Sequence, residues 1–289
     1  MAPEKYQPQC RPVLIGSLPL RDHRAADLMV WQHTPEIPVW AQLPAFAAES
    51  MTAQFLPGMP GLRTEGGKVF VDLESPSFPD DLTLFYEDYL AVTEGGADLL
   101  DSRFALEPGT AAGFFALLAT LEQAASPPLA VKGQVTGPLT FTLGVADRGG
   151  KAIFYDLQAR DAAVKLLALK ARWQIRRLAP FARPVIMFLD EPALAGFGSS
   201  ELISITREQI ADSLGEVIEA VHEEGGLAGV HVCANTDWGL LLDTGLDIVN
   251  FDAYHYFDRF ILYAEDIRRF LTRGGILAWG IVPTGPPEA

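Results

Sequence analysis

Short apolar segments alternate with amphipathic helical segments along almost the whole of this 289-residue chain. When a helix follows each strand, it returns the chain so that the next strand runs parallel to the last, and the helices cover the sheet. The alternation therefore predicts an α/β fold with a parallel sheet. Strands are predicted at 13–19, 38–44, 97–103, 129–138, 185–193, 228–235, 247–254 and 275–283.

Helices are predicted between these strands by their start and stop residues. The predicted helices cover 80–94, 111–125, 154–178 and 207–223, with a short one between the strands at 228–235 and 247–254. Thr206 and Gln209 form a capping-box pattern at the start of the fourth helix, and glycines follow its end.

Polar residues gather where the predicted strands end. In a (β/α)8 barrel the carboxyl ends of the strands carry the active site, and in an open doubly wound sheet the site lies at the same edge. No Gly-x-Gly-x-x-Gly sequence follows the first strand and no Walker A sequence occurs, so nucleotide-binding folds are disfavoured. Because many strands contribute, a TIM-type barrel is favoured. The polar residues at the predicted strand ends are Ser17, Thr136, Asp190, Glu191, His231, Cys233, Asn235 and Asp252.

The domain organisation is predicted to be simple. The chain shows no internal repeat and no inter-domain linker, so residues 1–289 are expected to form one domain, with 1–12 as an N-terminal extension. The segment 57–77 is rich in glycine and proline and is expected to form a long loop or hairpin over one end of the sheet.

His231 and Cys233 raise the question of a metal. Side chains at positions i and i+2 of a strand point to the same face, so the imidazole and the thiol should project together. They could be a packed histidine beside a small buried cysteine, or two zinc ligands. Asp252 ends the next strand, about 4.8 Å away in a parallel sheet, and could supply a third ligand.

Asp190 and Glu191 end an apolar strand and should point to opposite faces. Either carboxylate could bind an ammonium group or act as a base, or the pair could cap a helix. Ser17 in Gly-Ser-Leu-Pro could bind a substrate carboxylate or merely end a strand.

Composition excludes several functions. A net charge of −15 argues against nucleic acid, because phosphate binding needs a basic face. No apolar run approaches the ~18 residues of a membrane span, and the first residues lack a signal sequence. Only two cysteines are present, so no disulfide framework is expected, and the cytoplasm is the predicted location.

Four motifs occur in one order: GSLP, VTGPLT, LDEPAL and HVCAN. Together they resemble the catalytic barrel of cobalamin-independent methionine synthase, within the superfamily of uroporphyrinogen decarboxylase and the methylcobalamin:coenzyme M methyltransferases. The resemblance runs from about residue 13 to 284, and LDEPAL with His-x-Cys is its most specific part. It implies a TIM-type barrel and a Zn²⁺ ion that activates a thiol for methylation.

The resemblance assigns roles to individual residues. His231 and Cys233 match zinc ligands, and Asp252 falls where the family has a glutamate ligand. Asp190 matches an aspartate that binds the substrate amine. Ser17 and Glu49 match residues that hold the amino-acid substrate, and zinc would keep the substrate thiol deprotonated.

Four departures from the family pattern bear on this interpretation. Asp252 is one methylene shorter than glutamate, and no cysteine follows Cys233 to act as the family's last ligand. If 13–19 and 38–44 form one initial region, the barrel lacks its last β/α unit, and we expect either a truncated product or a partner chain that completes the barrel. The half of long methionine synthases that helps to bind folate is also missing.

The leading hypothesis is a zinc-dependent methyltransferase that acts on a thiol such as homocysteine. The methyl donor would be a methylated corrinoid protein or a methylfolate, although a chain with charge −15 attracts polyanionic folates poorly. One alternative is a uroporphyrinogen decarboxylase-like enzyme, which needs cations that PVWAQLPAF lacks. Another is a non-catalytic barrel that binds a corrinoid or a partner protein. A homo-oligomer is also considered, because an open sheet edge pairs readily with another chain.

Overall fold

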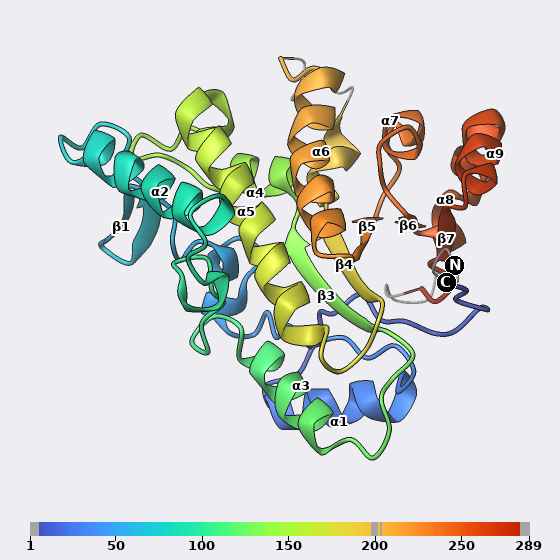
Figure 1. Cartoon of the computed structure of the whole chain (residues 1–289). Coiled ribbons are helices and arrows are strands. Elements are labelled where there is room, and N and C mark those ends of the chain that lie inside the picture. Colours follow the sequence, from blue (N-terminus) through green and yellow to red (C-terminus); the bar gives the residue numbers. More distant parts are fainter. Residues whose placement is uncertain (1–5, 198–201, 203, 284–289) are drawn as a thin grey trace.

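A parallel sheet of five strands forms the centre of the protein (Figure 1). The computed structural model describes residues 6–197, 202 and 204–283. The strands lie side by side in chain order, and each neighbouring pair is parallel. The predicted α/β fold with a parallel sheet is therefore confirmed. The strands are β3 (Val131–Thr136), β4 (Val185–Asp190), β5 (Leu227–Val232), β6 (Ile248–Phe251) and β7 (Ile276–Trp279).

Two extended segments continue the sheet beyond β3. Val39 forms an isolated parallel bridge with Lys132, and Ser17 forms one with Gln42. The segments 13–19 and 38–44, predicted as strands, thus run parallel to the sheet, and each pairing is a single isolated bridge. Their order in space again follows their order in the chain.

Helices follow the strands and pack on one side of the sheet (Figure 1). The capping box at the start of α6 is confirmed, since Thr206 accepts from the Gln209 amide and the Gln209 side chain accepts from the Thr206 amide. The α-helices are α1 (His23–His33), α2 (Phe78–Thr93), α3 (Ala112–Gln123), α4 (Pro138–Gly144), α5 (Leu157–Leu178), α6 (Arg207–Glu223), α7 (Trp238–Leu242), α8 (Ala253–Phe260) and α9 (Ala264–Thr272). Short 3₁₀ helices are η1 (Ala47–Glu49), η2 (Ala53–Phe55), η3 (Leu99–Asp101), η4 (Ile153–Tyr155), η5 (Pro192–Gly196) and η7 (Ile261–Tyr263).

Two local predictions concern the segments 97–103 and 57–77. The strand predicted at 97–103 is wrong: Asp98 accepts a hydrogen bond from the Leu100 amide and begins η3. A short polar side chain that bonds to a nearby amide favours a turn over an extended strand. The segment 57–77 contains the hairpin of β1 (Leu62–Glu65) and β2 (Lys68–Val71), whose strands are antiparallel.

The two faces of the sheet pack differently. On one face, strand residues such as Met187, Leu189 and Val230 join the main core with α5 and α6. On the other, strand side chains pack mainly against one another, among them Ile186, Phe188 and Ile248. Both faces thus bury apolar side chains, as is typical of parallel strands. We call the second face, away from α5 and α6, the inner face.

The sheet is open at β7 in the part of the chain that the structure describes. No described strand pairs with the outer edge of β7, and Trp279 at its end is half exposed. Closure into a barrel is therefore not seen among the described residues. No helix within them is long and apolar enough to cross a membrane.

Candidate functional site at the carboxyl ends of the strands

Four polar side chains form a row across the carboxyl ends of β3 to β6. Thr136 pairs with Asp190, Asp190 with His231, and His231 with Asn250. Residues paired in a parallel sheet point to the same face, so the row shares the inner face with Phe188, two residues before Asp190. We call these four residues the strand-end row. The sheet register thus brings together Asp190 and His231, which the sequence predicted, with Asn250, which it did not.

The His231 ring is held by Asn250. His231 Nδ1 lies 2.5 Å from Asn250 Oδ1, and Asn250 Nδ2 donates to the Ala278 carbonyl at 2.8 Å. Because the amide nitrogen is used on Ala278, its oxygen faces the imidazole, so Nδ1 carries the proton and Nε2 is the acceptor. Burial lowers the pKa of His231 to about 4, so the ring is neutral at pH 7. A polar residue inside the apolar run Ile-Val-Asn-Phe was the available signal for Asn250.

Asp190 carries a buried oxygen with no partner. The residue is only 5% exposed, and Oδ1 makes no hydrogen bond to any residue that the structure describes. Burial raises the pKa of Asp190 to about 6, while the charge of Lys132 lowers it. Buried polar atoms in proteins nearly always have a partner, so this oxygen is suited to accept a hydrogen bond from a ligand.

Lys132 lies on the same face of β3, four residues before Thr136, and is fully buried. Its Nζ donates to the Ile15 carbonyl at 2.5 Å and to Gln134 Oε1 at 3.3 Å, and it lies 4.5 Å from the centre of the Phe188 ring. Burial lowers the pKa of Lys132 to about 8. Lys132 was not among the residues predicted from the sequence, although a lysine inside a buried strand was a visible signal.

Glu191 belongs to a helix end instead of the row. Its Oε1 accepts from the Leu139 amide, and its Oε2 accepts from the Thr140 amide and hydroxyl, at 2.6–2.9 Å. It is fully buried, and burial raises its pKa to about 7. Both oxygens are thus occupied at the N-terminus of α4, where a carboxylate is favourable. The structure gives Glu191 the capping role that the sequence left open, and its contact with substrate stays a prediction.

The three predicted zinc ligands are not gathered. Asp252 is the N-cap of α8, where Oδ1 accepts from the His255 amide at 3.0 Å and Oδ2 lies 2.6 Å from His255 Nδ1. Cys233 is exposed, one residue beyond β5. Among the described residues, no group of three or more His, Cys, Asp or Glu side chains could hold a metal ion. As folded, this donor set does not fit zinc, and zinc stays a prediction from the sequence.

Ser17 and Glu49 lie on the segments that precede β3. Ser17 is exposed, and its hydroxyl is 3.5 Å from Gln42 Oε1. Glu49 is 4% exposed and bonds to His23 and to the Leu43 amide. The sequence singled out Glu49 but not His23, which comes from a helix 26 residues earlier.

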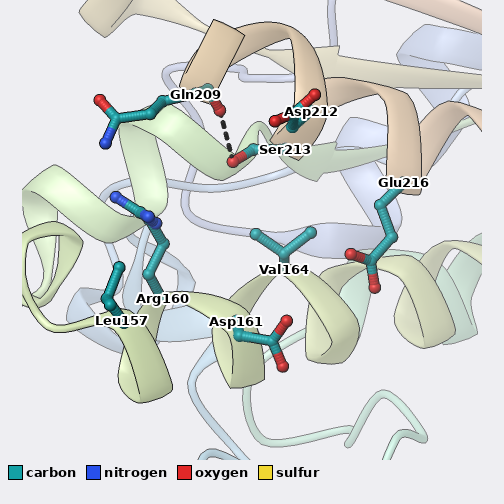
Figure 2. A pocket seen from close by; sticks show the side chains of 8 residues that line it. All are labelled: Leu157, Arg160, Asp161, Val164, Gln209, Asp212, Ser213 and Glu216. Atoms are coloured by element: carbon teal, nitrogen blue, oxygen red, sulfur yellow. Dashed lines mark hydrogen bonds between the residues drawn. The ribbon is translucent and has the colours of Figure 1, made fainter. Parts of the chain in front are cut away.

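Two surface pockets lie away from the row. The first, about 310 Å³, opens between α5 and α6 and is drawn in Figure 2. The second, about 330 Å³, lies beside the β1–β2 hairpin. None of the predicted site residues lines either pocket, so both belong to the outer surface of the helical layer and the hairpin. The first is lined by Leu157, Arg160, Asp161, Val164, Gln209, Asp212, Ser213 and Glu216.

Comparison with known proteins finds similarity in structure. No family model matches the chain, and no curated protein matches it in sequence. A methyltransferase from Methanosarcina mazei shares the fold with a TM-score of 0.50 at 10% identity, over 91% of this chain and 79% of that one. A B12-independent methionine synthase from Shewanella sp. W3-18-1, solved with selenomethionine, aligns with a TM-score of 0.37 at 19% identity.

The second alignment covers 56% of this chain and 48% of the synthase, so the chain spans about half the length of that protein. The fold shared with the Methanosarcina mazei methyltransferase agrees with the fold that the motifs implied. At 10% identity the first match concerns the fold alone, an α/β fold with a parallel sheet.

Proposed function

We propose that the protein is a methyltransferase whose acceptor is a thiol, with an amino-acid thiol of the homocysteine type as the preferred substrate. The order of the four motifs and the fold shared with a methyltransferase support this proposal. The single observation that carries it is the strand-end row with the unpartnered oxygen of Asp190. A methylated corrinoid protein or a methylfolate is the proposed donor.

The row offers complementary contacts for such a substrate. The buried Asp190 carboxylate would accept hydrogen bonds from the substrate ammonium group, which would supply the missing partner of Oδ1. The Nε2 atom of His231 faces no protein donor among the described residues and would accept a further hydrogen bond. The described residues bring no three possible metal ligands together, so the proposed reaction includes no metal-dependent step.

We also propose that the sheet is part of a TIM-type barrel. The two bridged segments and the five strands follow one another in space in chain order, which is the order of a (β/α)8 barrel. An eighth strand would have to lie between β7 and the 13–19 segment. A further part of the chain or a second copy could supply it.

The direct test is a methylation assay. The purified protein is incubated with homocysteine and isotopically labelled methylcobalamin or methyltetrahydrofolate, and the S-methyl product is measured by mass spectrometry. We expect labelled product with one of the donors, and loss of most of it in Asp190→Asn. Binding of the thiol without any transfer would favour the non-catalytic binding protein, and absence of binding would refute the thiol as acceptor.

A further inference from the structure

His23, at the start of α1, and Glu49, in η1, form a tightly held pair. His23 Nε2 lies 2.6 Å from Glu49 Oε1, and Glu49 Oε2 accepts from the Leu43 amide at 2.9 Å. The His23 ring stacks on Phe46, with the ring centres 5.3 Å apart and the planes inclined by 16°. The carboxylate is therefore fixed by a backbone amide, and the imidazole is fixed by the carboxylate and an aromatic ring.

The exposure of the two side chains differs in a way that suits proton transfer. Glu49 is 4% exposed, whereas the His23 side chain is 23% exposed. The Nδ1 atom of His23 has no hydrogen bond to the protein among the described residues. With Nε2–H donated to the carboxylate, Nδ1 is left as an acceptor on a partly exposed side chain.

Glu49 is linked along the chain to the strand-end row. Met51, two residues after Glu49, accepts a 2.5 Å hydrogen bond through its carbonyl from the Thr136 hydroxyl. Thr136 is the first member of the row and is paired with Asp190. Leu43, which fixes Glu49, follows Gln42, the residue bridged to Ser17. The pair is thus attached to the same end of the sheet as Asp190.

Other carboxylates at this end are less available for proton transfer. Glu191 has both oxygens on α4, and Asp252 has both on the first turn of α8. Asp190 is almost completely buried and is assigned to the substrate ammonium group. A base that passes its proton to water needs partial exposure, and the His23 side chain is 23% exposed.

We infer that His23, oriented by Glu49, is the acid–base residue that removes the proton from the acceptor thiol; this inference rests on the proposed function. The S–H bond breaks and the proton goes to Nδ1, which gives a thiolate and an imidazolium paired with Glu49. The thiolate sulfur then forms a bond to the methyl carbon. The bond between the methyl group and its donor breaks, and the donor keeps the electron pair: a corrinoid leaves as Co(I), whereas a folate takes up a proton from solvent at N5. The proton leaves His23 for solvent.

The first experiment needs no methyl donor. Homocysteine is added to the wild type and to His23→Ala, His23→Gln and Glu49→Gln, and the ultraviolet absorption of the thiolate is followed at pH 7. His33→Ala is the matched control, because His33 is an exposed histidine at the other end of the same helix. We expect a thiolate signal in the wild type and in His33→Ala, and its loss in both His23 variants. His23→Gln keeps a donor for the buried Glu49 and so guards against a folding defect.

The second experiment measures methyl transfer as a function of pH. At pH 7, His23→Ala should lower kcat about 10²–10⁴-fold with little change in KM, and added imidazole should restore part of the rate. Above the ordinary thiol pKa of about 8.5 the variant should approach the wild type, because the thiol then ionises without a base. The same loss at every pH would indicate a structural role and overturn the inference.

The outcomes separate the two proposals. A wild type that binds homocysteine as the thiolate but transfers no methyl group from either donor contradicts the proposed function while it supports the role of His23. A thiolate signal that survives both His23 substitutions overturns the role of His23 while it leaves the proposed function standing. Absence of a thiolate in the wild type also overturns the inference.

Discussion

Two adjacent carboxylates, Asp190 and Glu191, take opposite roles because a strand turns successive side chains to opposite faces. Glu191 points to the helical layer and accepts three hydrogen bonds at the start of α4. Asp190 points to the inner face, where its Oδ1 has no partner. A carboxylate whose hydrogen bonds are all made in the protein stabilises the fold, whereas one with an unmet oxygen is available to a ligand.

The role of Asp190 is tested by Asp190→Asn. An amide keeps the size of the side chain but removes the charge, so we expect homocysteine to bind about 10–100-fold more weakly, as measured by calorimetry. A thiol of the same length without an amino group should bind the variant and the wild type alike. Equal affinity of homocysteine for both proteins would contradict the assignment.

Metal content tests the predicted ligands His231, Cys233 and Asp252. The sequence predicts about one zinc per chain, lost in His231→Ala and in Cys233→Ser. For Asp252 to take part, its carboxylate would have to leave the first turn of α8. Elemental analysis of the purified protein and of both variants decides the question, and zinc retained in both variants would refute these ligands.

At the scale of elements, helix ends and close backbone approaches determine how the helices sit on the sheet. The N-terminus of α4 depends on Glu191, and this contact leaves no room at Gly137. A Cβ atom at Gly137 would lie 2.2 Å from the Glu191 Cδ atom. The glycine is therefore required by the close approach of a buried carboxylate, and not by an unusual backbone angle.

We expect Gly137→Ala to lower the free energy of unfolding by about 1–3 kcal/mol, because the methyl group displaces the carboxylate from the α4 amides. Gly215→Ala is the matched control: it lies inside α6 with no atom within 4 Å of the added Cβ. It should stabilise the protein by up to about 1 kcal/mol. Urea unfolding of both variants measures this, and a Gly137→Ala protein as stable as the wild type would be inconsistent with the contact.

The long helix α5 carries a buried lysine, Lys170. It is fully buried, its Nζ donates only to the Ala105 carbonyl among the described residues, at 3.3 Å, and burial lowers its pKa to about 7 against a weak opposing effect of Glu107. The unfolded chain binds more protons than the folded chain between the folded pKa and the ordinary value of 10.5. Stability should therefore rise with pH across this range.

Replacement of Lys170 by methionine should remove this rise and stabilise the protein at pH 7 by about 1–4 kcal/mol, because a buried charge is replaced by an apolar side chain of similar length. Thermal unfolding between pH 6 and 10 measures both effects. Lys68→Met, at an exposed position of the hairpin, is the control and should change neither. A destabilised Lys170→Met protein would show that the ammonium group contributes to the fold.

At the scale of the whole molecule, the open edge of β7 is the main unpaired feature among the described residues. Exposed apolar side chains surround this edge, including Phe257, Trp279, Ile281 and Val282. An unpaired parallel edge with apolar neighbours favours association with another strand.

We therefore expect self-association through this edge. Light scattering should detect a dimer, and Trp279→Lys should weaken it about tenfold or more, since a charge at an edge opposes pairing. Leu84→Lys, at an exposed apolar position on α2, is the control. A wild type that stays monomeric at high concentration would contradict this expectation.

Periodic patterns in the sequence were sufficient to predict the parallel order, five of the strands, the main helices and the capping box of α6, because these features depend on residues near one another in the chain. The same patterns placed Asp190 and His231 at strand ends, and the sheet register brought them together. Helix α1 was missed, although Asp22 caps it through the Ala25 amide and offered a local signal.

The partners of each site residue were decided only in the folded chain. Glu49 meets His23 from a preceding helix, and Glu191 meets the amides of α4. Asn250 and Lys132 joined the inner face through strand pairing. Hydrogen bonds between side chains far apart in sequence depend on the distances that packing sets, and a linear pattern does not contain those distances.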